Sequence, residues 1–514
     1  MNDCYMILFD ADHIKDYVYA TGRLKGIRGA SEHVRQLTSE SGIKALCAQV
    51  LQRPLRDEEF IYADGGAGAL LITGQADAQR LCLELEKTYR RATRRATLSA
   101  VMVLVGDDPA ETQDRAARML RQHKSSRAQA GAPPGGGYVR FCSADRLYPA
   151  IKPDPADPSA LLSGASLITH KLSHHYRENL ISSPFWQCFS QMINDPALQA
   201  QWETAITPNQ DLNAIGDLAQ PQGYVAMVYA DGDGIGDLIH QVVGREKFDG
   251  YRRLSQILSH AAIEATASAL YRAYPEPPHR YLPFEVITIG GDDVLLICTA
   301  EQGLEVACAL SRIFSAQVTT FLQNELGFPD QQVTVSVGVV IAHASQPIVT
   351  MQRRASELLK SAKHGKASEA AEGCVDFHIV STPGLEPIRD VRLNHYTLLR
   401  SNDSLTARPY RLSVMEKLLE QAGKIRAIPG SKRAQLYDAC MRAPDRIAAT
   451  LEVLRIQVRL GSQRDLLLNV LRALDVGVIY PFMYQQTTDV RSRFITPLID
   501  VLEVAEFVRQ GDRE

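Results

Sequence analysis

The sequence lacks any apolar run as long as a membrane span, which needs about 20 residues. It begins Met1-Asn2-Asp3 and continues into a short apolar stretch, so no secretory signal peptide is expected. None of its nine cysteines belongs to a C-x-x-C pair, and we therefore expect no zinc site. Scattered single cysteines indicate reduced thiols, which predicts a cytoplasmic protein without a membrane partner.

The sequence also lacks a strong excess of either charge, since 56 Lys and Arg oppose 59 Asp and Glu for a net charge of −3. Such a chain has no overall attraction to nucleic acid, so any contact with RNA or DNA must be local or made by partner subunits. One local basic run has helical spacing. It consists of Lys87, Arg90, Arg91, Arg94 and Arg95. Two interpretations stay open for it, a solvated helix face and a stripe that binds RNA or a partner protein.

At 514 residues the chain is too long for one ordinary core, and about two to four domains are expected. A proline-rich segment at 152–158 predicts a linker, and the apolar spacing beyond about residue 390 is almost entirely helical. We therefore expect a first domain at 1–150, a helical linker domain at 151–221, a second domain at 222–388 and a C-terminal helical domain at 389–514.

The most informative segment is Gly290-Gly291-Asp292-Asp293, which stands between two runs of apolar β-forming residues. This pattern predicts a β-hairpin with two acids at its turn. An earlier apolar strand ends at Asp231 and continues into a glycine-rich helix start, where Gly232 and Gly234 let backbone N–H groups approach phosphates. Acids at a strand end beside an acidic hairpin can hold two Mg²⁺ or Mn²⁺ ions. The pattern therefore predicts in-line displacement on a nucleoside triphosphate.

The chain also repeats itself weakly. Ile7-Leu8-Phe9-Asp10 resembles Val228-Tyr229-Ala230-Asp231, and Gly65-Gly66-Ala67-Gly68 lines up with the Gly290 segment. We interpret the repeat as two copies of one α+β unit, in which a strand, a helix, a hairpin, a helix, a strand, a helix and a strand follow one another. An antiparallel or mixed sheet with helices on one face suits this order.

The two copies differ at the turn. Ala67 and Gly68 replace the paired acids, so the first copy is predicted to be catalytically inactive and the second to carry the chemistry. The last strand of the unit is predicted at 139–142 in the first copy and at 375–378 in the second.

These residues resemble the palm domains of Cas10 (also called Cmr2 or Csm1), the large subunit of type III CRISPR complexes and a relative of the GGDEF nucleotide cyclases. The resemblance rests on the Gly290-Gly291-Asp292-Asp293 motif, on Asp231 and on Lys363 in Ser361-Ala362-Lys363, together with the degenerate first copy. It implies two ferredoxin-like palm domains, a helical linker and a C-terminal helical bundle. It further implies a synthase that joins ATP into cyclic oligoadenylate second messengers in antiviral defence.

The resemblance also implies partners, namely other type III effector subunits with guide RNA and target RNA. Family members often begin with an HD nuclease domain. This chain begins in the first palm and has no His-Asp dyad, so we expect it to lack that domain and its DNA-cutting activity.

The candidate catalytic acids are Asp231, Asp292 and Asp293, and together with Gly232 they are the candidate metal-binding positions. The candidate nucleotide-binding residues lie at the ends of predicted strands and near the starts of predicted helices, and two of them are lysines. They are Ser31, Gly232, Asp233, Gly234, Ser255, Gly290, Gly291, Lys363 and Lys366. The family position of Lys363 implies a role in neutralising charge on the β- and γ-phosphates, with Lys366 assisting.

Several alternatives stay open from the sequence. Asp233 could cap the following helix, and Ser31 and Ser255 could be packing or capping groups. The whole chain could be a GGDEF-like cyclic dinucleotide synthase or a scaffold subunit of a guide-RNA ribonucleoprotein. A pure scaffold, however, has no need to hold repelling carboxylates together.

Overall fold

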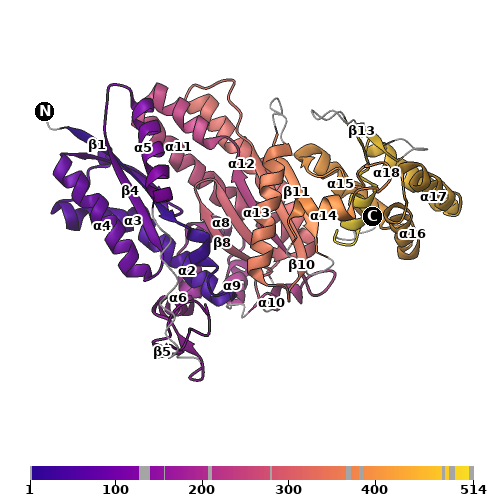
Figure 1. Cartoon of the computed structure of the whole chain (residues 1–514), viewed down its shortest axis with the longest axis horizontal. Helices are drawn as coiled ribbons and strands as arrows, with labels where there is room; N and C mark the ends of the chain where they lie inside the picture. Colours follow the sequence, from indigo (N-terminus) through magenta and orange to yellow (C-terminus); the bar gives the residue numbers. More distant parts are fainter. Residues whose placement is uncertain are drawn as a thin grey trace.

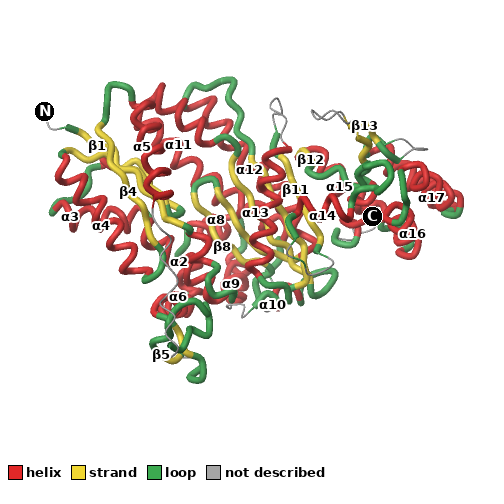
Figure 2. Tube along the Cα trace, in the orientation of Figure 1, coloured by secondary structure: helices red, strands yellow, loops and turns green. Residues whose placement is uncertain are grey.

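The computed structural model describes residues 3–126, 139–154, 157–206, 211–277, 281–365, 372–380, 384, 386–476, 481–485 and 493–508. Two large β-sheets follow one another along the long axis of the molecule, and a C-terminal part lies at the far end (Figure 1). That C-terminal part is almost entirely helical (Figure 2). The α+β fold class expected from the sequence is confirmed.

The first sheet is antiparallel, with its four strands in the order β2-β3-β1-β4. These strands are β1 (Cys4–Asp12), β2 (Phe60–Asp64), β3 (Ala67–Thr73) and β4 (Thr97–Leu104). Residues alternate between the two faces of a strand, and both Ile7 and Leu8 in β1 are buried. Helix α4 (Gln75–Thr93) packs on one face and α5 (Pro109–Ser126) on the other.

The second sheet is mixed, with its six strands in the order β12-β11-β10-β7-β9-β8 and a parallel pairing between β10 and β11. Its strands are β7 (Tyr224–Gly232), β8 (Phe284–Gly290), β9 (Asp293–Thr299), β10 (Val335–His343), β11 (Cys374–Ile379) and β12 (Tyr410–Arg411). Helices α11 (Ile235–Ala273) and α12 (Gly303–Glu325) cover one face, and α13 (Ile348–Gly365) covers the other.

The prediction of helices on one face of each sheet is wrong, because both sheets carry helices on both faces. The physical reason is visible in β7, where all residues from Val225 to Ala230 are buried. A strand that is apolar on both sides needs cover on both sides. The continuous apolar run at 225–230 is therefore typical of a central strand between two helical layers.

Helix α11 joins the two units. Its apolar residues recur at helical spacing, and Leu254, Leu258 and Ala261 are all buried. The helix is interrupted by non-helical backbone at Lys247, with φ 55° and ψ −153°. It packs on α12 within the second unit and on α5 and β2 of the first.

One hydrophobic cluster runs from the first sheet into the second. It contains Ile7 and Phe9 of β1, Met227 of β7 and Leu358 of α13. Between them lie residues of the helices that follow β1, which are α1 (Ile14–Val18), α2 (Leu24–Thr38) and α3 (Glu40–Leu51). The two units therefore share buried apolar surface, which fixes their relative positions.

The segment predicted as the last strand of the first unit, 139–142, does not join the first sheet. Phe141 forms only an isolated bridge with Pro149. This part of the prediction is wrong, because the alternation of a few residues cannot distinguish a sheet strand from an extended loop.

Helices connect the two sheets and follow the second. The connecting elements are β5 (Lys152–Pro153), β6 (Leu161–Leu162), α6 (Gly164–His174), α7 (Tyr176–Ile181), α8 (Pro184–Gln191), α9 (Pro196–Ala205) and α10 (Asn213–Gly216). Trp186 and Trp202 from this segment are buried beside α11. The C-terminal elements are α14 (Ile388–His395), α15 (Leu412–Ile425), α16 (Gly430–Met441), α17 (Arg446–Val458), α18 (Arg464–Ala473), β13 (Met483–Gln485), β14 (Arg493–Ile495) and α19 (Leu498–Ala505).

Among the described helices, none combines the length and the apolar character that a membrane crossing requires. All nine cysteines are free thiols.

Candidate active site

The predicted acidic hairpin is present. Gly290 at the end of β8 pairs with Asp293 at the start of β9, which leaves Gly291 and Asp292 as a two-residue turn. Gly291 has φ +61°, a conformation that glycine adopts without steric cost. The turn therefore presents Asp292 and Asp293 next to each other at the hairpin tip.

Asp231 reaches the same place from the neighbouring strand. Strand β7 lies between β9 and β10, and Ala230 pairs with Val294 just beyond the hairpin turn. Gly232 follows, and a Cβ atom there would stand 2.7 Å from Asp292 Oδ2. The absence of a side chain at Gly232 is what allows the Asp292 carboxylate to approach the end of β7.

Burial and a neighbouring charge both act on the two hairpin carboxylates. Burial and the negative charge of Asp231 raise the pKa of Asp292 to about 6 and that of Asp293 to about 7. Asp293 Oδ1 is buried and accepts no hydrogen bond from the residues that the structure describes. A buried carboxylate oxygen without a donor, beside two further acids, is the environment that a bound cation stabilises.

Lys363 provides a positive charge at this cluster. It lies near the end of α13, where its ammonium group forms an ion pair with Asp231 and donates a hydrogen bond of 2.9 Å to the carbonyl oxygen of Gly232. The structure thus brings Lys363 to the candidate catalytic acids, 132 residues away in sequence from Asp231. Lys366 lies outside the described residues.

A second lysine at the cluster was missed by the sequence analysis. Lys15, from α1 of the first unit, donates a hydrogen bond of 2.6 Å to the Tyr229 hydroxyl, which in turn donates to Asp293 Oδ2 at 3.3 Å. Burial lowers the pKa of Lys15, while the charges of Asp293 and Asp231 oppose that shift. The sequence offered only its position as a signal. Lys15 lies five residues after Asp10, the counterpart of Asp231 in the first unit.

The first unit repeats this arrangement without the paired acids. Lys124 forms an ion pair with Asp10 and donates to the carbonyl oxygen of Ala11 at 3.1 Å, as Lys363 does with Asp231 and Gly232. At the hairpin turn, however, Gly66 and Ala67 stand where the second unit has Asp292 and Asp293, because Asp64 pairs with Ala67 as Gly290 pairs with Asp293. The predicted replacement of the acids by Ala67 and Gly68 is therefore wrong by one residue. The duplicated framework is therefore present in both copies, whereas the acid pair is present in one.

The two hairpin turns touch each other. A Cβ atom at Gly290 would stand 2.6 Å from the Cα atom of Gly65, closer than real Cβ contacts come. Asp64, next to Gly65, accepts hydrogen bonds from the Gly291 N–H at 3.1 Å and from the Ser259 hydroxyl at 2.7 Å. The first hairpin thus forms a wall directly behind the acidic turn of the second.

Other predicted residues lie around the cluster in different roles. Asp233 accepts a hydrogen bond of 2.7 Å from the Thr334 hydroxyl, and the residue that caps α11 is Gly234. Ser31 donates to the carbonyl oxygen of Ile287 in β8, and Ser255 lies half-buried on α11. Their assignment as nucleotide-binding residues stays a prediction.

The donor set suits a hard divalent cation, because carboxylate oxygens are the ligands that Mg²⁺ and Mn²⁺ prefer. In the described parts of the chain, no three His, Cys, Asp or Glu side chains are already arranged around a common metal position. Lys363 instead pairs with Asp231. The unpartnered oxygen of Asp293 and the raised pKa values of the hairpin acids are the observations that fit a cation here.

Comparison with known proteins agrees with this geometry. Residues 224–371 match the family model described as Cas10/Cmr2, second palm domain. No curated protein matches the chain. Among solved structures the chain is similar to Csm1 in T. onnurineus, with 15% sequence identity and a TM-score of 0.59 over 99% of this chain and 70% of that one.

Two further similar structures hold nucleotides. One is the Csm1–Csm4 cassette in complex with cA4, with 14% identity and a TM-score of 0.56 over 92% of this chain and 70% of that one. The other is the Csm1–Csm4 cassette in complex with one ATP, with 14% identity and a TM-score of 0.59 over 99% and 70%. Residues 224–371 are therefore similar to the second palm domain of the Cas10/Cmr2 family, within a chain whose fold is similar to that of Csm1.

Proposed function

We propose that the chain is a metal-dependent nucleotidyltransferase that converts ATP into cyclic oligoadenylates, as a Cas10-type subunit in type III CRISPR defence. The observation that carries the proposal is the meeting of Asp231, Asp292 and Asp293 with Lys363 at the hairpin of a Cas10/Cmr2 second palm. The Csm1–Csm4 cassettes in complex with cA4 and with ATP, which share the fold, support ATP as substrate and a cyclic product.

In each coupling step the 3′-hydroxyl of one nucleotide releases its proton to solvent and its oxygen bonds to the α-phosphorus of another, the bond between the α- and β-phosphates breaks, and pyrophosphate leaves with the electron pair. Mg²⁺ or Mn²⁺ ions held by Asp231, Asp292 and Asp293, with Gly232 beside them, would activate the hydroxyl and stabilise the leaving group. Lys363 would neutralise charge on the triphosphate, which offers its ammonium a more highly charged partner than Asp231.

The backbone at the start of α11 would contact phosphate as well. Gly234 and Gly236 have open space where a Cβ would stand, and α11 begins at Ile235. Free N–H groups at a helix N-terminus attract anions. Phosphates placed there would lie just beyond the end of β7 and next to the carboxylates.

The proposed partners are other type III subunits with guide RNA and target RNA, because the similar structures include Csm1 bound to Csm4. The nine free thiols suit the reducing cytoplasm.

The test is incubation of the purified protein with ATP and Mg²⁺ or Mn²⁺, with and without candidate RNA activators, followed by mass spectrometry of the products. We expect cyclic oligoadenylates from the wild type and a loss of about 100-fold or more in the variant Asp292→Asn/Asp293→Asn. The matched control is Asp57→Asn/Glu58→Gln, which removes two exposed acids of the first palm. Absence of any oligonucleotide under all conditions, or equal product from the hairpin variant, would contradict the proposal.

A further inference from the structure

Four buried polar side chains meet in the segment that follows the first palm. They are Cys142 and Asp145 from a tight turn, and Ser163 and Ser166 from the start of α6. The Asp145 carboxylate accepts from the Ser163 hydroxyl at 2.7 Å and from the Ser166 hydroxyl at 2.9 Å. The Cys142 thiol donates to the Ser166 hydroxyl oxygen at 3.4 Å. We refer to these four residues as the polar tetrad.

The spacing of the polar tetrad along the sequence is typical of a metal site. Its members form two pairs, each with two residues in between, and seventeen residues separate the pairs. Zinc ribbons carry four cysteines in this pattern, with two residues inside each pair and about 15 to 20 between the pairs. In this chain only Cys142 is a cysteine, and an aspartate and two serines hold the other three positions.

The turn that carries Cys142 also has the backbone of a metal-binding turn. Cys142 Sγ accepts the backbone N–H groups of Ala144 and Asp145 at 3.4 and 3.5 Å. Arg146, directly after the pair, has φ 54°, a left-handed conformation for which glycine is the usual residue. Backbone N–H groups that point at a sulfur are the kind of outer contact that orients a thiolate ligand. The turn therefore directs the side chains at 142 and 145 to one place.

Hydrogen bonds fill the space that an ion would take. Around a tetrahedral Zn²⁺ with Zn–S bonds of about 2.3 Å, the sulfur atoms lie about 3.8 Å apart. The hydrogen-bonded contacts within the polar tetrad are shorter, at 2.7 to 3.4 Å. Asp145 Oδ1 also accepts the N–H groups of Leu147 and Tyr148, at 2.9 and 3.0 Å. All four acceptor positions of this carboxylate are therefore taken by donors.

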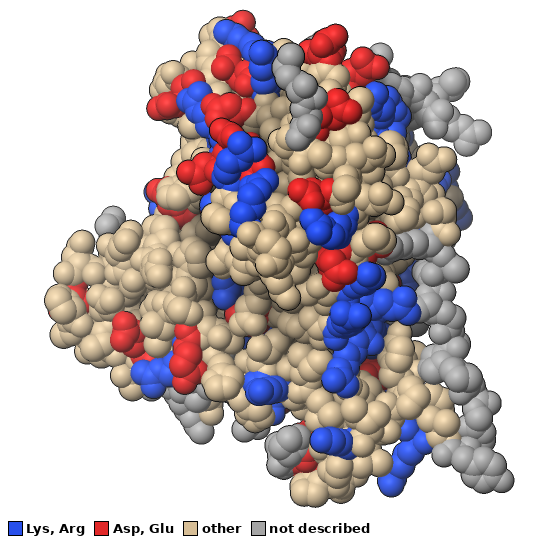
Figure 3. Space-filling view, turned by 90° about the vertical axis from the view of Figure 1, so that its left-hand side faces the viewer, with Lys and Arg blue, Asp and Glu red and all other residues tan. Residues whose placement is uncertain are grey.

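The charges around the polar tetrad do not favour a cation either. Burial raises the pKa of Asp145, but the four hydrogen bonds that its oxygens accept lower it by more, so its pKa lies below the ordinary value. The carboxylate is thus an anion that donors already stabilise. On the end of the molecule shown in Figure 3, the exposed charges of the lower part, at the height of α6 and β5, are mainly basic. A divalent cation would meet repulsion from them.

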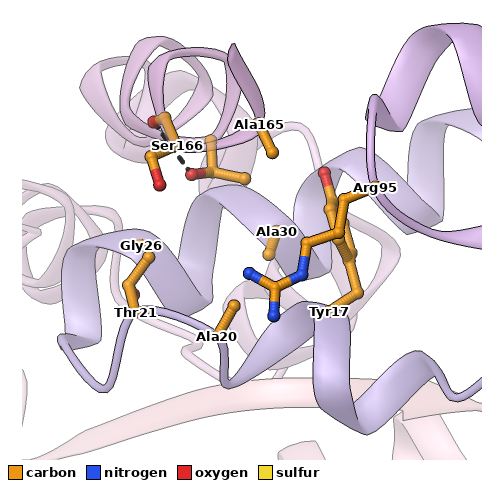
Figure 4. A pocket seen from close by; sticks show the side chains of 9 residues that line it. Tyr17, Ala20, Thr21, Gly26, Ala30, Arg95, Ala165 and Ser166 are labelled. Carbon is orange, nitrogen blue, oxygen red and sulfur yellow. Dashed lines mark hydrogen bonds between the residues drawn. The ribbon is translucent and has the colours of Figure 1, made fainter. Parts of the chain in front are cut away.

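The polar tetrad fixes the start of α6 beside the first palm. Ser163 is the N-cap of α6, and its hydroxyl oxygen accepts the Ser166 N–H at 3.2 Å. Figure 4 shows Ser166 on α6 and Ala30 on the neighbouring α2. The two helices approach closely at Gly29 of α2, where a Cβ atom would stand 1.8 Å from the Thr169 carbonyl oxygen. A displacement of α6 would therefore disturb its contact with the first palm.

We propose that the polar tetrad is a metal-free replacement for a zinc site, in which hydrogen bonds to Asp145 join the turn at 142–146 to the start of α6. The attachment of α6 to the first palm then does not depend on a metal, whereas the proposed chemistry at the acidic hairpin does. The four positions keep the arrangement of metal ligands. Cysteine at the three changed positions should therefore be enough to create a tetrahedral metal site.

The experiment is a Co²⁺ titration of the full chain carrying Asp292→Asn/Asp293→Asn, the parent chain, in which the carboxylate cluster cannot contribute. In this parent, Asp145→Cys/Ser163→Cys/Ser166→Cys should bind one equivalent, because its thiols release protons and coordinate the ion. The readouts are the near-ultraviolet charge-transfer absorbance of thiolate-bound Co²⁺ and the visible d–d bands of a tetrahedral site. The parent should show neither. Adding Cys142→Ala to the triple variant should weaken the charge-transfer band, since one of the four sulfur ligands is lost.

Hydrogen exchange measured by mass spectrometry tests the hydrogen bonds themselves, again in the parent chain. Asp145→Ala removes the acceptor of the Leu147 and Tyr148 N–H groups, so exchange in the peptide 142–149 should be about tenfold faster or more. The matched control is Asp157→Ala, an exposed aspartate of the same segment that accepts the N–H and the hydroxyl of Ser159. This control should leave exchange in the peptide unchanged, as should EDTA or ZnCl₂ added to the parent.

Thiolate-bound Co²⁺ in the parent overturns the proposal, as does a folded triple variant without the tetrahedral spectrum. Exchange that Asp145→Ala leaves unchanged, or that EDTA accelerates in the parent, overturns it as well. Thermal melts identify a triple variant that does not fold, and Ser163→Cys/Ser166→Cys, which keeps Asp145 as a fourth ligand, then takes its place. Since every protein in these measurements lacks the hairpin acids, their outcome leaves ATP turnover by the wild type as a separate question.

Discussion

Lys15 of the first palm and Tyr229 of the second are joined by a hydrogen bond of 2.6 Å, and Lys15 Nζ also lies 4.5 Å from the centre of the Tyr229 ring. This contact brings a positive charge from the first unit to the acids of the second unit. It lowers the pKa of Asp293 against the larger effect of burial. The degenerate palm therefore helps to set the electrostatics of the site in its partner palm.

Replacing this lysine should shift the pH dependence of cation binding. In Lys15→Gln the Asp293 carboxyl loses a stabilising charge and holds its proton more tightly, so the midpoint of Mn²⁺ binding should move to higher pH. At a pH well above 7, where the carboxyls are ionised in both proteins, we expect about fivefold tighter Mn²⁺ binding in the variant, because about 1 kcal/mol of repulsion between the ammonium and the cation is removed. Calorimetry across a pH series measures this, with Lys171→Gln on the exposed side of α6 as the control. Equal midpoints for both variants would contradict the role given to Lys15.

The stability of the metal-free protein should fall as pH rises from about 4 to about 7. The ordinary pKa of an aspartate is 3.8, whereas Asp292 and Asp293 have raised pKa values of about 6 and about 7 in the fold. In that window the unfolded chain has released protons that the folded chain still holds, so raising the pH lowers the free energy of unfolding. Mn²⁺ should reverse the loss, because a cation favours the ionised carboxylates.

Thermal melts in EDTA and in MnCl₂ at several pH values check this expectation. The Mn²⁺-induced rise in Tm should be larger at pH 8 than at pH 5, and it should be nearly absent in Asp292→Asn/Asp293→Asn. A rise in Tm that is the same at both pH values, or the same in the variant, would show that the ions bind elsewhere.

Gly232→Ala should damage the site more than the fold. The added methyl group would stand 2.7 Å from Asp292 Oδ2, so the carboxylate has to move away from the end of β7. We expect Mn²⁺ binding to weaken about tenfold, with a destabilisation of about 1 to 3 kcal/mol from crowding. The control Gly244→Ala lies within α11, and the nearest atom to the added methyl group, Ala110 Cβ of α5, is 3.7 Å away, so this variant should stabilise the helix by up to about 1 kcal/mol. Mn²⁺ binding that survives in Gly232→Ala would place the cations away from Asp292.

Gly290→Ala tests the contact between the two hairpins. A methyl group at this position would meet the Gly65 backbone at 2.6 Å, and backbone cannot move aside as a flexible side chain can. Urea unfolding should show a destabilisation of about 1 to 3 kcal/mol. Gly106→Ala, whose nearest neighbour is 3.8 Å away, should lie within about 0.5 kcal/mol of the wild type. If both variants have the same stability, the two turns do not pack as described.

Much of the second palm could be predicted because its signals are local. The Gly290-Gly291-Asp292-Asp293 segment specifies its own turn, since the two glycines provide the backbone freedom and the flanking apolar runs provide the strands. Asp231 could be predicted from its place at the end of an apolar strand before a glycine-rich segment, and the matching ion pairs of Lys124 and Lys363 support the repeat.

The contacts between the palms could not be predicted in the same way. Tyr229 is one apolar-looking residue in a buried strand, and Lys15 is one lysine in a short helix, so neither stands out until the sheets are packed. The helical layers on both faces were missed for a different reason, since the apolar run at 225–230 indicates cover on both sides of β7 but does not say which distant segments provide it. The strand predicted at 139–142 was wrong for another reason. Its local pattern suits a strand, but the segment has no neighbouring sheet strand to pair with.

The close approach of Gly65 and Gly290 has an evolutionary consequence for the pair of hairpins. Because each tip is the other's nearest neighbour, neither can acquire a bulkier residue unless the other retreats. We therefore expect selection to keep the first hairpin, although it lacks the acid pair, as the surface against which the second turn holds its shape. Substitutions in the first unit should accumulate most slowly at its hairpin turn and fastest in the strands farthest from the second hairpin.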